Sequence, residues 1–219
     1  MKGMLREYRG LLLFILLMGL FRSAIADWNV VPTGSMRPTI IEGDRILVNR
    51  LAYDIRIPFT SVSLWHIANP VRGDIVVFNS AAADMRMVKR VIGLPGDRIT
   101  MRDNRLYING RQLVYSSDRQ ACTTAQSDTY HYYKEWLDTR EHCLQTEAFS
   151  PGFANFGPVE VPDGYYLVLG DNRDHSADSR VYGFIPGHEI VGRAGHVVMS
   201  LDTNNYYLPR AGRFFQPLK

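Results

Sequence analysis

The sequence predicts a mainly β fold, in which an antiparallel β core follows an N-terminal transmembrane helix. Three observations lead to this prediction. Short β-branched runs bounded by turn residues recur through the body of the chain. Helical periodicity is weak beyond the N-terminus. The one long apolar run, residues 11–21, lies near the N-terminus behind basic residues.

The N-terminal segment has two interpretations. Its apolar core is short, and Ala24-Ile25-Ala26 is an acceptable cleavage site, which suits a cleavable signal peptide. Alternatively, a helix of about 19 residues, 8–26, spans the bilayer, with Arg22 and Trp28 at the outer interface. The basic flank predicts a cytoplasmic N-terminus, so either interpretation places the body of the chain outside the cytoplasm.

The expected strands follow in order. Residues 45–50 and 74–78 are β-branched, and each follows a Gly-Asp pair that predicts a turn, Gly43-Asp44 and Gly73-Asp74. Further strands are expected at residues 85–92, 105–110, 165–169 and 190–200. Residues 132–145 have the strongest helical pattern of the body.

Composition changes in the middle of the chain, where residues 112–158 are polar, aromatic and poor in strand pattern. We therefore expect an inserted subdomain, residues 101–163, between two parts of one β core, residues 28–100 and 164–219, after an N-terminal anchor, residues 1–27. Cys122 and Cys143 lie in the insertion, and they are expected to pair because the body is expected to be exported; in the cytosol they would stay reduced.

Residues 55–70 contain apolar side chains without clear alternation, among them Phe59, Leu64 and Trp65. Such a segment is either a loop packed on the core, the interpretation we favour, or a loop that enters a membrane interface.

The overall composition excludes few functions. The chain of 219 residues is 46% hydrophobic and 21% charged, which is ordinary for a folded protein. Its net charge of +3 comes from basic residues scattered among acidic ones, so nucleic-acid binding is not expected.

A candidate nucleophile, Ser35, lies in a tight Pro-flanked segment soon after the apolar run. A serine needs a base, and none of the six histidines has a spacing typical of a Ser-His-Asp enzyme. Lys89 lies on an apolar strand, where burial would lower its pKa towards neutrality and make it a base. The alternative is an ordinary edge-strand lysine in water.

A third polar segment, residues 170–180, follows an expected strand. It could be a solvated loop, or a calcium site built from Asp171, Asp174 and Asp178, although the EF-hand glycine and terminal glutamate are missing. It could also be a buried polar network in which Asp178 pairs with Arg180.

Together these segments resemble the bacterial type I signal peptidases (leader peptidases), membrane-anchored Ser-Lys serine proteases. The matching stretches are residues 32–39, 43–50, 72–78 with 88–97, and 170–186. The resemblance implies the antiparallel β catalytic core of that family. It also implies cleavage of signal peptides from exported preproteins after small residues (Ala-X-Ala).

The resemblance assigns the site residue by residue, without metal or cofactor. Ser35 is the nucleophile and Lys89 the general base, and the Ser35 N–H and the Thr33 hydroxyl form the oxyanion hole. The supporting residues are Ser176, which orients the amine, and the ion pair of Asp178 and Arg180.

The substrate is expected to bind as an added strand along residues 29–35 and 86–89. Its small side chains would enter shallow pockets lined by Val31, Pro32, Met36, Ile40, Met87 and Val88.

The expected partners are preprotein signal peptides and the lipid bilayer. The expected form is a single-pass monomer of the bacterial inner membrane with its catalytic domain on the periplasmic side, which favours an uncleaved anchor.

Two features depart from the family pattern. His175 occupies a position where asparagine is usual, and the sequence contains one apolar segment where some members have two. Three alternatives remain: a dedicated peptidase of a conjugation or secretion system, an inactive membrane-bound scaffold homologue, and a cytosolic self-cleaving repressor-type protease. The last lacks support, because the chain has an export signal and no helix-turn-helix candidate.

Overall fold

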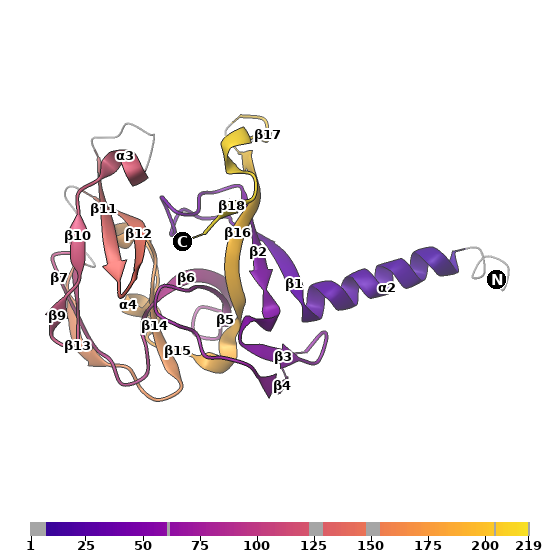
Figure 1. Ribbon diagram of the computed structural model, residues 1–219, viewed down its shortest axis with the longest axis horizontal. Helices are drawn as coiled ribbons and strands as arrows, with labels where there is room; N and C mark the ends of the chain where they lie inside the picture. The colour runs from indigo at the N-terminus through magenta and orange to yellow at the C-terminus, as the bar shows by residue number, and fades with distance from the viewer. Residues whose placement is uncertain (1–7, 61, 123–128, 148–153, 204, 219) are drawn as a thin grey trace.

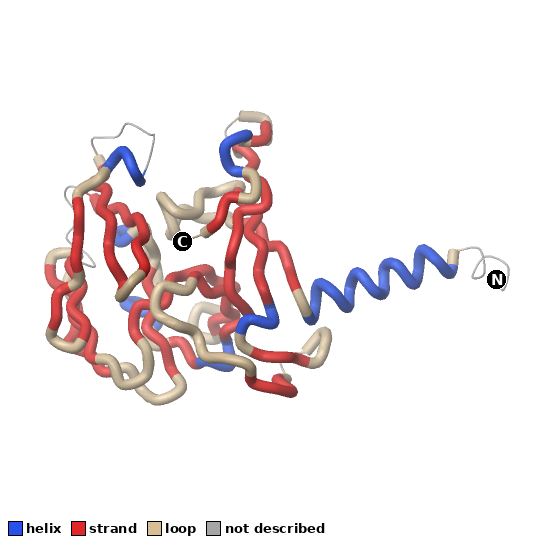
Figure 2. The backbone as a smooth tube through the Cα atoms, viewed as in Figure 1, coloured by secondary structure: helices blue, strands red, loops and turns tan. Residues whose placement is uncertain are grey.

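The computed structural model describes residues 8–60, 62–122, 129–147, 154–203 and 205–218. Helix α2 (Arg9–Ala24) projects away from a body built mostly of strands (Figure 1). Figure 2 shows the same division, with strands forming most of the body and only short helical turns between them. The named strand pairs are antiparallel, which confirms the predicted mainly β fold.

The largest sheet contains strands from both ends of the chain. Its order is β1 (Ala26–Val30), β2 (Asp44–Asn49), β16 (Ile190–Asp202), β5 (Ile75–Ser80), β6 (Met85–Gly93), β14 (Tyr165–Leu169) and β15 (Ile185–Pro186). Two short strands, β17 (Leu208–Pro209) and β18 (Gln216–Pro217), also pair with β16. The long strand β16 joins the N-terminal strands to the centre of the sheet.

The predicted Gly-Asp turns are confirmed at the starts of β2 and β5. Gly43 and Gly73 have φ of 87° and 88°, a backbone region that favours glycine. The following aspartates accept hydrogen bonds from backbone N–H groups three residues earlier, Asp44 from Ile41 and Asp74 from Val71. Each turn therefore fixes where its strand begins.

Smaller sheets are built from the middle of the chain. One sheet has the order β13 (Phe156–Glu160), β7 (Arg98–Arg102), β8 (Arg105–Ile108) and β9 (Arg111–Gln112). Another contains β10 (Val114–Ser116), β11 (Tyr130–Leu137) and β12 (Arg140–Glu147). The short helices are α3 (Arg119–Cys122) and α4 (Ser179–Tyr182). The domain boundaries drawn from the sequence stay predictions.

The helical interpretation of residues 132–145 is wrong, because this stretch lies in the hairpin of β11 and β12. Leu137 pairs with Arg140 across a two-residue turn, and Asp138 in that turn has a positive φ of 55°. Aromatic and β-branched residues in the hairpin pack well in strands, and the cross-strand pairing outweighs the weak helical pattern.

Residues 55–70 are not a loop packed on the core. They include the hairpin of β3 (Asp54–Arg56) and β4 (Ser63–His66), whose apolar side chains face outward. Trp65 and Phe59 are each 70% exposed. The hairpin lies near the base of α2 (Figure 1), and the Phe59 N–H donates to Ser23 Oγ of that helix.

The membrane-spanning helix expected over residues 8–26 is not found: within the described part of the chain, every helix falls short of the length and apolar character needed to cross a bilayer. Helix α2 ends at Ala24, since the chain has already turned into strand β1 at Ala26, where it pairs with Asn49 of β2.

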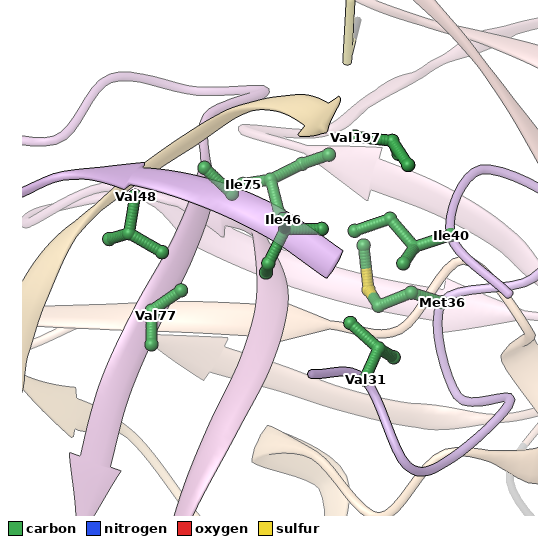
Figure 3. Close-up of a cluster of buried hydrophobic side chains, with 9 residues drawn as sticks. Val31, Met36, Ile40, Ile46, Val48, Ile75, Val77 and Val197 are labelled. Carbon is green, nitrogen blue, oxygen red and sulfur yellow. The ribbon is translucent and has the colours of Figure 1, made fainter. Parts of the chain in front are cut away.

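A buried cluster of apolar side chains links the large sheet to the segment that carries Ser35. Figure 3 shows side chains of that segment, among them Met36 and Ile40, pointing toward Ile46 of β2. Met36 and Ile40 are at most 1% exposed. Because burying a large aliphatic side chain contributes about 1.5–3 kcal/mol, this contact holds the segment firmly on the sheet.

Cys122 and Cys143 form a disulfide whose Cα atoms are 5.4 Å apart. Replacing both with serine should lower the free energy of unfolding by about 3 kcal/mol, because the unfolded chain regains the freedom of the closed loop. Urea unfolding of wild type and the double variant checks this. A reductant should lower the wild-type midpoint to that of the variant, and equal midpoints without reductant would contradict the prediction.

Candidate active site

Ser35 is held on a rigid turn. The Arg37 N–H donates to the Gly34 carbonyl, and the Ile40 N–H donates to the Met36 carbonyl. The neighbouring Met36 side chain is anchored in the core, whereas Ser35 itself is partly exposed. The hydroxyl of Ser35 is therefore fixed at the surface by the burial of the residue that follows it.

The polar segment 170–180 reaches the same turn by backbone contact. A Cβ on Gly170 would lie 2.4 Å from the Ser35 carbonyl oxygen and 2.2 Å from Ser176 Oγ, so only glycine allows this approach. Asn172 then holds the turn, because its N–H donates to the Ser35 carbonyl (3.1 Å) and its Nδ2 to the Gly34 carbonyl (3.0 Å).

Asn172 and Gly170 were not singled out in the sequence. The one feature of the sequence that could have indicated them is their position in residues 170–180, the segment with the most specific family resemblance. Their contacts with Gly34 and Ser35 span more than 130 positions, so they cannot be predicted from local sequence pattern.

Lys89 of β6 meets Ser35 directly, with its Nζ 2.6 Å from Ser35 Oγ. The lysine is 4% exposed, so the alternative of an edge-strand lysine in water is wrong. Burial lowers the pKa of Lys89 from 10.5 to about 8, although the charges of Asp178 and Asp171 act in the opposite direction. A neutral amine is therefore accessible near physiological pH.

Asp178 and Arg180 form the expected ion pair beside the site. Both guanidinium nitrogens Nε and Nη2 lie 2.8 Å from the Asp178 carboxylate oxygens, and that carboxylate also accepts the Gly170 N–H. Burial raises the pKa of Asp178, but the bonds from Arg180 outweigh it and leave the pKa below its usual value. The solvated-loop interpretation does not fit a pair this deeply buried.

Ser176 lies close by and is 4% exposed. Its Oγ is one of the hydrogen-bonding neighbours that lower the pKa of Asp178, and it also lies next to Gly170. Its role in orienting the lysine amine stays a prediction.

A second buried ion pair stands behind Lys89. Arg90, on the opposite side of β6, donates from Nε and Nη2 to both oxygens of Asp171, at 2.8 and 2.7 Å. The Thr39 hydroxyl also donates to Asp171. Neither Arg90 nor Asp171 is more than 1% exposed, so the charge of Asp171 is matched without solvent.

The hairpin of β11 and β12 completes this network. Arg173 donates to both oxygens of the fully buried Glu135. The ring of His142 lies 3.8 Å from both Glu135 and Asp171. Burial, with Arg90 and Arg173 nearby, lowers the pKa of His142 well below its usual value, so the ring is neutral.

The calcium alternative for residues 170–180 does not fit these contacts, because each of the three carboxylates has its own partner. Asp171 pairs with Arg90 and Asp178 with Arg180. Asp174 accepts from Asn104 Nδ2 and from the Glu147 N–H.

A cleft of ≈ 440 Å³ opens beside Ser35 and Lys89. Most residues expected to line the substrate pockets border it: Val31, Pro32, Met36, Met87 and Val88, together with Thr33. Ile40 does not border it, because its side chain is fully buried in the core beneath the turn. His175 borders the cleft and contacts Glu147 through Nε2 at 2.5 Å.

Two strand edges border the cleft. β1 pairs with β2 on one side, and β14 pairs with β6 only at residues 90–93. Among the described residues, the other edge of β1 and the outer edge of β6 at residues 85–89 have no strand partner. Both run toward the Ser35–Lys89 pair, so an extended peptide can add a strand between them.

Comparison with known proteins agrees with this geometry. The family described as signal peptidase, peptidase S26, matches residues 5–199. A "Signal peptidase I" from Pseudomonas aeruginosa is 36% identical over 214 residues, which is 92% of this chain and 74% of the relative. A "Signal peptidase I" from Pseudomonas fluorescens is 36% identical over 86% of this chain and 69% of the relative. A "Signal peptidase I" from Rickettsia bellii is 30% identical over 89% of this chain and 73% of the relative. The chain belongs to the signal peptidase family.

Proposed function

We propose that this protein is a serine endopeptidase that removes signal peptides from exported preproteins, with Ser35 and Lys89 as a catalytic dyad. The observation that carries the proposal is the 2.6 Å contact between Lys89 Nζ and Ser35 Oγ at the edge of a peptide-sized cleft. A buried amine next to a serine hydroxyl is a base next to its nucleophile.

In the proposed reaction, the neutral amine of Lys89 takes the proton of the Ser35 hydroxyl as Oγ bonds to the scissile carbonyl carbon. The Ser35 N–H and the Thr33 hydroxyl stabilise the resulting oxyanion. The lysine then gives its proton to the departing amine as the C–N bond breaks. Water, deprotonated by the same amine, hydrolyses the acyl-enzyme and frees Ser35.

The cleft walls support a preference for small side chains next to the cut. Val31, Met36 and Met87 are bulky and buried, so they cannot move aside without cost. An alanine fits against such walls, whereas a larger side chain must displace packed atoms. This supports cleavage after Ala-X-Ala sequences.

The same geometry supports a position at a membrane. Leu11 to Leu17 of α2 are each more than half exposed on a helix that projects from the body (Figure 1). The β3–β4 hairpin, which contacts the base of that helix, exposes Phe59 and Trp65 as well. So much apolar surface is compatible with lipid and not with water. The disulfide supports an oxidising compartment outside the cytoplasm. Single-pass insertion at the bacterial inner membrane stays part of this proposal.

Cleavage of a preprotein with an Ala-X-Ala site tests the dyad. Wild type should cut at that site, and Lys89→Ala and Lys89→Arg should both lose turnover by about 10²–10⁴-fold, because alanine carries no base and an arginine does not deprotonate in proteins. Lys134→Arg on β11 carries the same chemical change outside the cleft and should keep wild-type activity.

Circular dichroism of the Lys89 variants must show a folded protein. Substantial turnover by Lys89→Arg would refute the neutral-amine mechanism. Failure of wild type to cut any general preprotein would favour a dedicated substrate or an inactive scaffold.

The pH dependence follows from the lowered pKa of Lys89. Since only the neutral amine accepts the serine proton, kcat/KM should rise about tenfold per pH unit below pH 8 and level off above it. Initial rates with a fluorogenic peptide between pH 6 and pH 10.5 measure this. A rise that continues past pH 10 would mean that the amine has an ordinary pKa.

Lipid binding of α2 can be tested by flotation with vesicles of phosphatidylethanolamine and phosphatidylglycerol. Wild type should float, and Leu13→Glu combined with Leu16→Glu should reduce binding more than tenfold, because two apolar contacts become charged. Val114→Glu changes an equally exposed apolar residue of β10 and should still float. Equal flotation of all three proteins would contradict a lipid role for α2.

A further inference from the structure

Arg86 borders the cleft at a distance from the Ser35–Lys89 pair. It lies on β6 three residues before Lys89, a separation of about 10 Å along a strand. Its Nη1 donates to Asn29 Oδ1 of β1 at 3.0 Å, and its Nε donates to Asn79 Oδ1 of β5 at 2.9 Å. Arg86 and Asn29 both border the cleft, so the guanidinium bridges the two strand edges between which a peptide would lie.

The charges around Arg86 leave this part of the cleft positive. The Asp27 carboxylate binds Arg22 at 2.6 Å and lies 3.8 Å from Arg86 Nη1. Arg50 is close enough to interact electrostatically with both Asp27 and Arg86. The guanidinium groups of Arg22, Arg50 and Arg86 therefore all interact with Asp27, and they outnumber the carboxylates even when Asp84, two residues before Arg86, is included. A further arginine in the vicinity, Arg56, is paired with Asp54 and leaves this balance unchanged.

The bonds that hold Arg86 are ones that a substrate can replace. Both acceptors are neutral amide oxygens, and the arginine side chain is 41% exposed. A hydrogen bond from guanidinium to a carboxylate is roughly twice as strong as one between neutral groups. An acidic side chain arriving in the cleft therefore binds Arg86 better than Asn29 does.

We propose that Arg86 is a specificity residue that favours an acidic side chain, and disfavours a basic one, at the fourth or fifth position before the cleaved bond. An extended peptide advances about 3.3 Å per residue, so the residue beside Arg86 lies about three positions before the one beside Lys89. This inference rests on the proposed function. It adds a second determinant of substrate specificity, several residues before the small side chains next to the cleaved bond.

The test uses peptides with an Ala-X-Ala site that differ only in carrying Glu, Gln or Lys at the fourth or at the fifth position before the cut. Wild type, Arg86→Glu and Arg111→Glu are compared by kcat/KM. Arg111 is an exposed residue of β9 outside the cleft, so its variant makes the same change of charge elsewhere.

At one of the two positions, wild type and Arg111→Glu should prefer Glu over Lys by about two- to fivefold, the range expected for a partly exposed ion pair. Arg86→Glu should reverse the order, and the Gln peptide should change least. Assays in neutral detergent, with and without phosphatidylglycerol, separate substrate recognition from binding of an anionic lipid headgroup.

Cleavage without any preference between Glu and Lys would overturn the inference and leave the proposed function intact. An effect of Arg86→Glu that is equal for all peptides and needs phosphatidylglycerol would assign the arginine to lipid instead, and so would also overturn it. No cleavage of any peptide by wild type would contradict the proposed function itself, and this inference with it.

Discussion

The arrangement of the site depends on lowering the pKa of one buried lysine amine, so that its neutral form becomes accessible near pH 8. Burial disfavours the charged form of Lys89, while the carboxylates of Asp178 and Asp171 favour it. Each of these carboxylates is bound through two nitrogens of its own arginine, Arg180 or Arg90. The arginines offset most of the negative charge that faces the amine, so burial determines the direction of its pKa.

This constraint explains why segments far apart in sequence converge on β6. Neighbouring residues of a strand point to opposite faces, so Lys89 contacts Ser35 in the cleft while Arg90 contacts Asp171 behind it. The β11–β12 hairpin adds the buried pair of Glu135 with Arg173. Because removing one partner of such a pair costs about 3–5 kcal/mol, the β11–β12 hairpin and the segment of residues 170–180 are coupled energetically.

Local sequence pattern predicted the parts that local forces decide. The Gly-Asp turns before β2 and β5, the strand that carries Lys89, and the pairing of Asp178 with its near neighbour Arg180 all follow from short-range features. The apolar strand around Lys89 made that lysine a candidate base for Ser35, but the family resemblance was needed to assign the pair, since 54 positions separate the two residues.

Local sequence pattern gave wrong predictions where long-range packing determines the structure. Ile40 was expected at the cleft because it is apolar and near Ser35, yet the turn of the chain places it in the core. Cross-strand pairing of β11 with β12 outweighs the weak helical pattern of the same residues. The apolar side chains of the β3–β4 hairpin are exposed because no other described part of the fold packs over them, which local pattern does not indicate. None of these outcomes is encoded within a single segment.

Direct titration of the lysine amine tests the central claim most closely. The chain has four lysines, so selective ¹³Cε labelling gives few NMR signals, and Lys89→Ala assigns the relevant one. We predict that the Lys89 signal titrates with a pKa of about 8, well below the value of about 10.4 that lysine has in model peptides. A Lys89 signal that titrates above pH 10 would contradict the account, because the amine beside Ser35 would then be charged throughout the physiological range.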